Sequence, residues 1–387
     1  MNISELCREA EAYIIEQRRW FHQHPEVSLK ETGTSRKVQD ELQTMGIPFK
    51  VLADQIGVVA TIQGAFDGKR IGIRADMDAL PVVEETGLAF RSENPGIAHA
   101  CGHDAHIAML LGAARVLGQL RAELHGTVKL FFQSAEELAL GVREILDYLK
   151  EDGGVDEIIG LHIWSAIPSG QIKLKPGPLF TGGNAFYIHI TGKGGHGARP
   201  DLVHDPVKAA CDLVLQLSSI PVNYYDVLDN SVVSVGKVQA GSFENVFPSE
   251  AFVTGTTRHY KPGGAEKLKE QIRRKCQGVA MIHDVKVDVD FNTGVIPVIN
   301  DEDGIARARR LVPEINGLVL CPDPDPIPAG DNIGFLIDAY KGFYAILGGG
   351  IPGREVYPQH HPKFDIDESA LRKGSEFLVR YSLDFLS

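Results

Sequence analysis

Cysteine is scarce in this chain of 387 residues, and the few thiols are widely spaced. They are Cys7, Cys101, Cys211, Cys276 and Cys321. An odd number of cysteines scattered in this way argues against a disulfide framework and is typical of a reducing compartment. The N-terminal residues carry both signs of charge in an amphipathic pattern, unlike an export signal, so we predict a cytoplasmic location.

Long hydrophobic runs and basic clusters are also missing. No apolar stretch approaches the ~18 residues of a membrane-spanning helix. Acidic residues outnumber basic ones, 51 to 39, which gives a formal net charge of -12. Nucleic acids and anionic membranes attract concentrated positive charge, so neither is expected as a partner. Hydrophobic residues make up 43% of the chain, which is enough for a sizeable core.

Predicted strands and helices alternate over residues 1–180. Two helices are expected within residues 2–45, separated by a loop at His24 and Pro25. Strands are then predicted at 58–62, 71–74, 127–133 and 157–163, and helices at 103–120 and 142–150. This alternation indicates an α/β fold with a mostly parallel sheet and helices on both faces.

The pattern changes over residues 181–292. Strands are predicted at 184–191, 231–239, 250–257 and 285–291, and helices at 206–219 and 265–279. This β-α-β-β-α-β order is that of a ferredoxin-like α+β unit of the size of an inserted domain. The α/β character returns over residues 293–387, with a helix at 304–310, a strand at 343–347 and a final helix after Asp367. The proline-rich stretch 321–332 is expected to be an irregular surface loop.

The segment AHACGHDAH, residues 98–106, presents Cys101 and His103 just before a predicted helix. A thiolate and an imidazole in such a loop can bind a borderline divalent metal. A Cys-x-His pair alone is a weak signal, because chance and core packing produce many of them. His99 and His106 are predicted to be structural or to support a ligand from behind.

Further candidate ligands follow other predicted strands. Glu136 and Glu137 come directly after one strand, where open α/β sheets bind ligands. One carboxylate can bind metal while the other accepts a proton from water; the alternative is two solvated charges that open a helix. His162 ends the strand EIIGLHIW, where the alternative is a core histidine bonded to a backbone carbonyl. YPQHHPKF presents His360 and His361, of which only one need point inward.

These candidates gain weight as a set, because strand ends and the loops into helices converge on one edge of a doubly wound sheet. The predicted ligands are Cys101, His103, Glu137, His162 and His360. Five nitrogen, oxygen and sulfur ligands suit two divalent ions better than one structural zinc. Asp76 and Asp78 in RADMDALP add carboxylates to the same edge; we expect Asp78 to orient a ligand and Asp76 to be structural or supporting.

RADMDALP, HACGHDAH, GLHIW, GKGGHGARP and the final His-x-Pro-x-Phe resemble the amidohydrolase branch of the aminoacylase/carboxypeptidase-G metallopeptidase family. That branch includes hippurate hydrolases, auxin-conjugate hydrolases and N-acetyl-diaminopimelate deacetylases. The match runs in order from about Trp20 to Ile366. The resemblance implies a di-metal catalytic domain at 1–180 and 293–387. It also implies an inserted lid or dimerisation domain at 181–292. The protein is therefore expected to form a homo-oligomer, namely a dimer.

The resemblance also implies roles for single residues. Cys101, His103, Glu137, His162 and His360 would bind two divalent ions, manganese, zinc or cobalt. Glu136 matches the general base, and His196 of GGHG matches a histidine that stabilises the oxyanion, in its own or in a partner subunit. Asn245 and Arg258 match positions that face the substrate's carboxylate; the alternative for Arg258 is a surface strand arginine. The chain departs from the family pattern at Ser134, where proline is common, and in GARPDLVHDP after the lid histidine, neither of which removes a ligand.

The expected reaction is hydrolysis of the amide bond of N-acyl amino acids, or of related small amides, by a metal-activated water. Glu136 would accept the proton of the water and return it to the leaving amine. Two alternatives stay open: a dipeptidase or aminopeptidase, for which the sequence shows no partner for a free substrate amine, and a catalytically silent ligand-binding protein.

Overall fold

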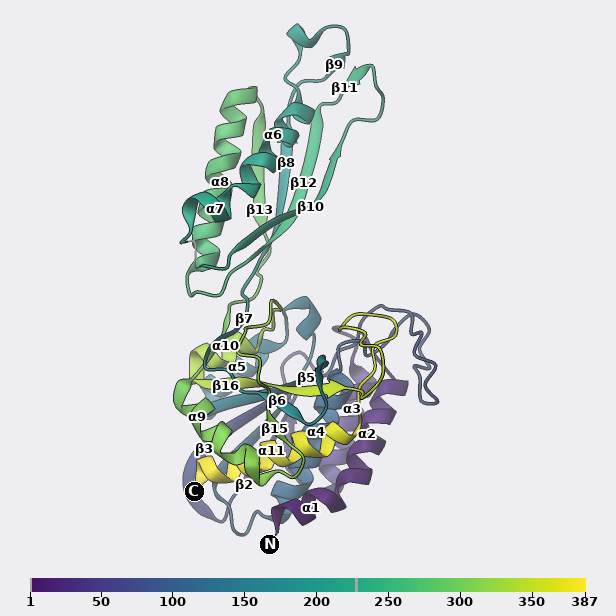
Figure 1. Cartoon of the computed structure of the whole chain (residues 1–387), viewed down its shortest axis with the longest axis vertical. Coiled ribbons are helices and arrows are strands. Elements are labelled where there is room, and N and C mark those ends of the chain that lie inside the picture. The colour runs from purple at the N-terminus through teal and green to yellow at the C-terminus, as the bar shows by residue number, and fades with distance from the viewer. Residues whose placement is uncertain (1, 227–228) are drawn as a thin grey trace. The chain divides into compact units, whose positions relative to one another are not determined.

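The structure is a computed structural model that describes residues 2–226 and 229–387. These residues form two compact units, both drawn in Figure 1. Unit 1 comprises Met1–Leu179, Ile299–Pro326 and Asn332–Ser387, and unit 2 comprises Phe180–Val298 and Ile327–Asp331. The catalytic role of residues 1–180 and 293–387 and the lid role of residues 181–292 are still predictions.

Unit 1 is built on an eight-stranded sheet with the order β1-β2-β4-β3-β5-β16-β6-β15. Its strands are β1 (Phe49–Val51), β2 (Val58–Gln63), β3 (Phe66–Asp76), β4 (His125–Gln133), β5 (Glu157–Pro168), β6 (Gln171–Lys173), β15 (Val319–Leu320) and β16 (Gly342–Gly350). The central neighbours β4, β3, β5 and β16 run parallel, whereas the pairs β1-β2, β2-β4 and β16-β6 are antiparallel. The predicted mixed α/β fold with a mostly parallel sheet is confirmed.

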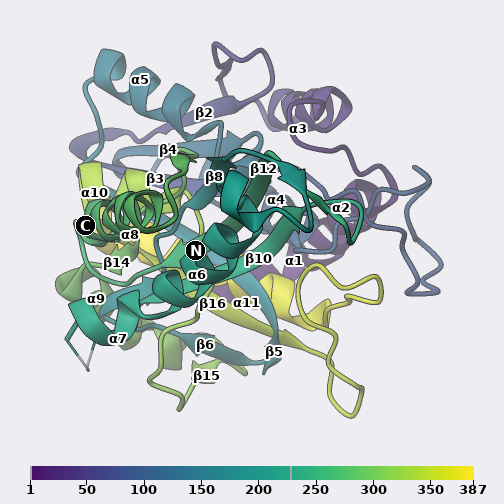
Figure 2. The same ribbon diagram turned by 90° about the horizontal axis from the view of Figure 1, so that it is seen from above.

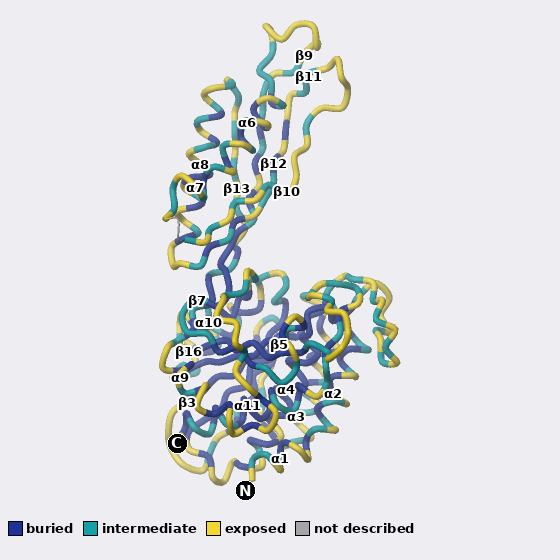
Figure 3. The backbone as a smooth tube through the Cα atoms, viewed as in Figure 1, coloured by how far each residue is buried: buried dark blue, intermediate teal, exposed yellow. Residues whose placement is uncertain are grey.

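Helices cover both faces of this sheet. The helices of unit 1 are α1 (Ile3–Glu9), α2 (Glu11–Gln23), α3 (Thr32–Thr44), α4 (His103–Gln119), α5 (Val142–Asp152), α9 (Glu302–Leu311), α10 (Ile333–Tyr340) and α11 (Ser369–Leu386). Successive strand residues point to opposite faces. On β5, Gly160 faces Ile333 of α10, whereas Leu161 lies against Gly374 of α11. The parallel strands are therefore buried on both sides, as Figure 3 shows for β5 and β16.

The N-terminal region differs from its prediction, because three helices take the place of two. The extra break falls at Ala10, between α1 and α2. The amides of Ala10 and Ile14 still bond to Leu6 and Ala10, so the apolar periodicity continues across the break. This continuity explains why the pattern predicts one helix there.

Unit 2 contains a four-stranded antiparallel sheet with the order β10-β12-β8-β13. Its elements are β8 (Ala185–Thr191), β9 (Gly195–His196), α6 (Pro206–Ser218), α7 (Ile220–Tyr224), β10 (Val232–Ala240), β11 (Val246–Phe247), β12 (Glu250–Arg258), α8 (Gly264–His283) and β13 (Lys286–Phe291). Strands β8, β10, β12 and β13 with helices α6 and α8 follow the predicted β-α-β-β-α-β order. The core forms where α6 and α8 pack on one face, with Ile188, Leu213 and Ile272 fully or almost fully buried.

The strands β7 (Gly177–Phe180) and β14 (Val298–Asn300) lie where the chain passes between the units. The stretch 321–332 is irregular and largely exposed, but the prediction of a surface loop is wrong at its end, where Asp331 and Asn332 are buried. Among the described residues, no helix combines the length and the apolar character needed to cross a bilayer. Figure 2 shows the same ribbon from above.

Candidate metal centre

Cys101 and His103 are presented by the sharp entry into α4. Between them Gly102 adopts a left-handed backbone with φ of 93°, and a Cβ there would lie 2.6 Å from Cγ2 of Ile163. Only glycine combines this φ with such a close approach at no steric cost. The turn therefore lets both side chains point to the same side, and both are almost completely buried.

The structure brings all five predicted ligands together in unit 1. Cys101, His103 and His162 place potential ligand atoms within 4.8 Å of one another, and so do Cys101, Glu137 and His360. We call these the inner group and the outer group; they share Cys101. The Sγ of Cys101 lies 3.6 Å from Nε2 of His162, and Nε2 of His360 lies 3.4 Å from Oε1 of Glu137.

The two glutamates sit on a single turn at the end of β4. A short 3-10 helix spans Glu136–Leu138, and Ala135 and Ala139 on either side have φ of 52° and 57°. The amide of Glu137 donates to Oδ2 of Asp78 at 3.0 Å. The amide of Asn332 approaches Oε1 of Glu136 at 3.4 Å. Adjacent residues on this turn thus face different partners, as two distinct roles require.

Hydrogen bonds fix the orientation of the buried imidazoles. His103 donates through Nδ1 to the carbonyl oxygen of Asp78 at 2.8 Å, and Asp78 Oδ1 lies 3.2 Å from the same nitrogen. His162 donates through Nδ1 to the carbonyl of Ile163 at 2.6 Å. Each ring therefore leaves Nε2 for the centre, which is the usual arrangement of metal-binding histidines. Asp78 lies where a residue that orients a ligand should lie.

The other histidines of the AHACGHDAH segment have different surroundings. His106 donates through Nδ1 to Asp76 at 2.5 Å and accepts from the amide of Ile163 through Nε2 at 2.9 Å. Both of its nitrogens are occupied, so it supports the centre without facing it. His99 is buried with no hydrogen-bond partner for either nitrogen among the described residues, and burial lowers its pKa to about 4.

His360 and its neighbour His361 point in different directions. The backbone of His360 is left-handed, with φ of 69°, and its amide donates to the carbonyl of Ala100 at 2.7 Å. This bond ties the loop to the residue before Cys101. His361 instead stacks on Tyr357 with ring centroids 4.7 Å apart, and its Nδ1 accepts from the amide of Lys363. Of the two, His360 faces the centre.

The electrostatics of the centre suit bound cations. Burial raises the pKa of the Cys101 thiol, so a thiolate there needs a positive neighbour. Burial, with His106 and His103 adding to it, lowers the pKa of His162, which keeps that imidazole neutral and able to ligate. Oε1 of Glu137 is buried and lies 3.4 Å from Nε2 of His360 and 3.9 Å from Nε2 of His103. A buried carboxylate oxygen flanked in this way by nitrogen donors, with sulfur nearby, fits a pair of divalent metal ions.

The remaining predicted residues lie in unit 2 and fall into two places. His196 on β9 is paired with Val246 on β11, and the carbonyl of Asn245 accepts from the amide of Gly197 at 2.8 Å. His196 and Asn245 are therefore neighbours, and both are exposed. Arg258 is half-buried at the far end of β12, where its Nη1 donates to the carbonyl of Thr257.

The length of β12 separates these two places. Glu250, at the start of β12, pairs with Thr191, only a few residues before His196, whereas Arg258 ends the strand. Nine residues of antiparallel strand span about 27 Å. The structure thus brings His196 and Asn245 together but does not bring Arg258 to them within this unit.

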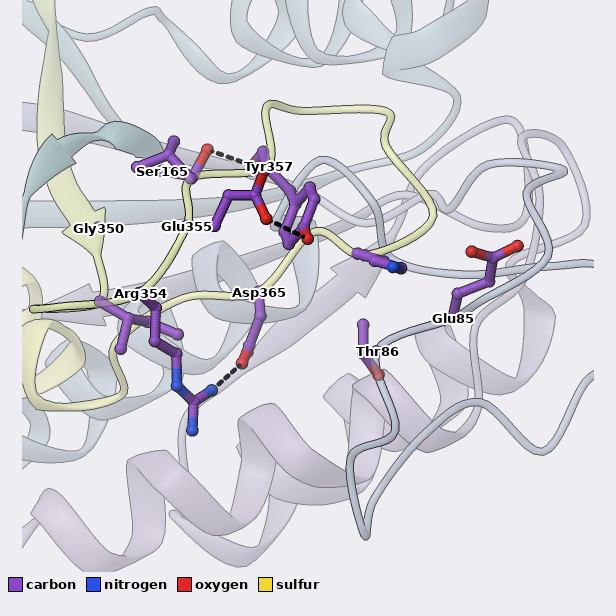
Figure 4. A pocket seen from close by; sticks show the side chains of 11 residues that line it. Glu85, Thr86, Ser165, Gly350, Arg354, Glu355, Tyr357 and Asp365 are labelled. Carbon is purple, nitrogen blue, oxygen red and sulfur yellow. Dashed lines mark hydrogen bonds and ion pairs between the residues drawn. The ribbon is translucent and has the colours of Figure 1, made fainter.

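A cavity of about 240 Å³ lies beside the loop that carries His360 (Figure 4). Ser165 of β5 and Gly350 at the end of β16 form part of its wall. Tyr357 and Arg354 line it from the loop, and Arg354 approaches Asp365 at 3.5 Å. None of the five candidate ligands is among the described residues that line the cavity, although β5 carries both Ser165 and His162.

The sequence did not predict the buried polar residues behind the turn of Glu136. Arg74 donates to Asp76, Gln133 and Asn332, and Asn332 also approaches Glu136 through its amide. The signal for Asn332 was present, because an Asn directly before the apolar run IGFLIDAY is typical of a helix N-cap. The prolines that precede Asn332 instead favour an irregular loop up to residue 332.

Known proteins resemble the chain over almost its full length. The model of Peptidase family M20/M25/M40 matches residues 72–384. An N-acetyl-L-cysteine deacetylase from Bacillus subtilis is 35% identical over 98% of this chain and 88% of its own. An N-acyl-L-amino acid amidohydrolase from Geobacillus stearothermophilus is 38% identical over 79% of this chain and 82% of its own.

A solved structure agrees with both. The YXEP protein of Bacillus subtilis, described as a dinuclear metal-binding peptidase from the M20 family, superposes with a TM-score of 0.85 at 33% identity, covering 98% of this chain and 99% of its own. The predicted resemblance is therefore confirmed. A chain with these ligand groups, this fold and these relatives belongs to Peptidase family M20/M25/M40.

Proposed function

We propose that the protein hydrolyses the amide bond of N-acyl amino acids with two divalent metal ions. The observation that carries this proposal is the joining of the inner and outer groups through Cys101, directly beside the turn of Glu136 and Glu137. Relatives of the chain are named as a deacetylase of N-acetylcysteine and as an amidohydrolase of N-acyl amino acids. Manganese, zinc and cobalt are all suited to the donor set, and we leave the choice among them to measurement.

The residues of the chain divide the chemistry as follows. Bound metal ions would act as Lewis acids and lower the pKa of a water from about 16 to about 7. Glu136 accepts the proton of the attacking water and returns it to the leaving nitrogen. The carboxylate of Glu137, whose backbone amide donates to Asp78, would bind the ions. His196 donates to the oxyanion, a contribution typically of about 3 kcal/mol per donor.

Substrate recognition is assigned to polar groups and to the cavity. Arg258 offers a planar fork that matches a carboxylate in a bidentate way, and Asn245 adds an amide beside His196. The cavity of about 240 Å³ is of a size for a small acyl group or amino-acid side chain. Its wall combines Ile351 and Val356 with charged residues, so we expect small substrates with an apolar part.

The separation along β12 favours a dimer in which subunits share sites. One small substrate cannot span about 27 Å, so His196 and Arg258 of one copy cannot both touch it unless unit 2 deforms. We propose that Arg258 serves the site of its own subunit and that His196 and Asn245 serve that of the partner. Unit 2 would then act as both lid and dimerisation domain. The five free cysteines support a cytoplasmic location.

The test is amine release by metal-free protein from a panel of N-acyl amino acids, with and without added manganese, zinc or cobalt. Unblocked dipeptides form the second arm. Metal-restored cleavage of the acylated substrates alone supports the proposal, and cleavage of the dipeptides alone would make the protein a dipeptidase. Two bound metal equivalents without any cleavage would favour a silent binding protein.

A further inference from the structure

The turn that carries Glu136 and Glu137 is held from outside by two carboxylates. The amide of Glu137 donates to Oδ2 of Asp78, which also accepts from the hydroxyl of Ser28 at 2.6 Å. The amide of Ala135 donates to Oε1 of Glu31 at 2.7 Å. Both contacts reach the turn from the segment Ser28–Glu31, directly or through Asp78.

Ala135 is the strained member of this turn. Its φ of 52° lies in the left-handed region, which is unfavourable for any residue with a Cβ. Such a conformation persists where the surroundings hold it in place, and Ala135 is fully buried next to Glu136. If this peptide relaxed, the carboxylates of the next two residues would turn with it.

Glu31 is placed to keep the backbone of Ala135 in its left-handed conformation. The residue is fully buried, and its Oε2 has no hydrogen-bond partner among the described residues. A buried carboxyl group is costly, and burial raises the pKa of Glu31 to about 7. Among the described residues no ion pair offsets this cost, and the carboxylate is stabilised by backbone amides, of which that of Ala135 is the one on the turn.

The position of Glu31 is itself fixed by neighbouring structure. Its carbonyl oxygen accepts from the amide of Ser35 at 2.9 Å, in the first turn of α3. A few residues earlier, the amide of Ala79 donates to the carbonyl of Glu26 at 2.8 Å, which ties the same segment to the chain just after Asp78. Glu31 therefore connects the start of α3 to the turn that carries Glu136 and Glu137.

We propose that Glu31 is a positioning residue for Glu136 and Glu137. It acts through its hydrogen bond to the amide of Ala135, which keeps Ala135 left-handed. The inference rests on the proposed function for its kinetic consequence. Its consequence for metal binding through Glu137 does not depend on the substrate.

The experiment compares E31Q, E31M and the double variant E31M/A135G with wild type. E31Q keeps an acceptor oxygen for Ala135, whereas E31M keeps the volume and removes the acceptor. Glycine at position 135 adopts a positive φ without the penalty of a Cβ, so it should replace the hold of Glu31. A135G alone calibrates the effect of the glycine itself.

Two readouts are taken on each full-length variant: kcat and KM with the best acylated substrate, and titration of metal-free protein with Co²⁺ followed by its visible spectrum. For E31M we expect kcat to fall by about 100-fold at nearly constant KM, as for other small displacements of reacting groups. The second equivalent of Co²⁺ should bind about 10-fold more weakly, as when a residue supporting a ligand is lost. E31Q should stay within about 3-fold of wild type, and A135G should restore most of the loss in E31M.

Wild-type kcat and cobalt affinity in E31M would overturn the proposal. So would a loss that A135G leaves unchanged while thermal unfolding shows a folded protein, because Glu31 would then act by a route other than the backbone conformation of Ala135. If E31M does not fold, E31A takes its place with the same double variant. If wild type binds two equivalents of Co²⁺ but cleaves no amide, the proposed function fails, and the cobalt titration still decides the role of Glu31.

Discussion

At the scale of single residues, the candidate metal centre contains side chains whose pKa values or surroundings differ from those of exposed groups. Cys101 is a thiol whose burial raises its pKa, and Glu137 keeps a buried carboxylate oxygen 3.4 Å from Nε2 of His360. Asp76 and Cys101 raise the pKa of His103 although burial opposes this. A bound cation would stabilise the Cys101 thiolate and the Glu137 carboxylate, and it would take the place of the proton on His103.

Replacement of Glu136 by glutamine should abolish turnover and leave metal binding intact. The amide cannot accept the proton of water, whereas all five predicted ligands remain. We expect a loss of at least about 1,000-fold in kcat, with two metal equivalents still bound as measured by elemental analysis. Substantial remaining activity would remove Glu136 from the role of base.

The paired histidines provide a matched comparison. H360A removes the exposed candidate ligand of the outer group, so one metal equivalent should bind at least about 10-fold more weakly and activity should fall with it. H361A removes a ring that stacks on Tyr357 and should change both quantities by less than about 3-fold. Isothermal titration of the metal-free variants measures the difference; equal effects would mean that either histidine can serve.

At the scale of elements, unit 1 positions its ligands by bringing the ends of parallel strands to one edge. The sequence could predict this convergence, because Asp76 ends β3, the two glutamates follow β4, and parallel strands share their carboxyl edge. The prediction that His162 ends its strand is wrong, because β5 continues to Pro168. The sequence could not predict Glu31 or Asn332. Their partners lie 104 and 258 positions away along the chain, at Ala135 and Arg74, and no local pattern encodes such contacts.

Helix α4 carries His103 and crosses its neighbours closely. A Cβ on Gly112 would lie 2.5 Å from Cγ1 of Ile14 and 2.8 Å from Oγ of Ser375. G112A should therefore lower the free energy of unfolding by about 1–3 kcal/mol through overpacking.

The control is G118A on the same helix, where the nearest atom to a new Cβ is Cδ1 of Ile47 at 3.6 Å. This contact is ordinary, so the higher helix propensity of alanine should raise stability by up to about 1 kcal/mol. Urea denaturation of both variants measures the difference. A neutral G112A would show that α2 and α11 can move apart.

At the scale of the whole molecule, we propose that unit 1 carries out the metal chemistry and that unit 2 adds substrate contacts. The sequence predicted His196, Asn245 and Arg258 together, yet it gave no sign that β12 would hold Arg258 apart from the other two. The separation of His196 from Arg258 depends on which end of β12 lies beside the segment of His196, and this register depends on pairing partners that the sequence does not name.

Sharing of sites between subunits can be tested by complementation. E136Q and H196A should each be inactive as pure proteins, because each lacks one essential group. Mixed dimers formed by coexpression hold one intact site, assembled from the metal centre of the H196A subunit and the lid of the E136Q subunit. We expect mixed dimers to recover about half of wild-type activity, measured after separation by two affinity tags. No recovery in verified mixed dimers would place His196 in the site of its own subunit.

The place of β16 in the sheet has a consequence for biosynthesis. This strand, Gly342–Gly350, lies between β5 and β6 yet is synthesised long after both of them. Until it emerges, β5 presents an unpaired inner edge, the kind of surface on which chains aggregate. Most of unit 2, residues 180–298, is synthesised in the meantime, while unit 1 waits for β16 and for α11. Nascent chains of this protein should therefore depend on chaperones mainly between the synthesis of β5 and that of β16.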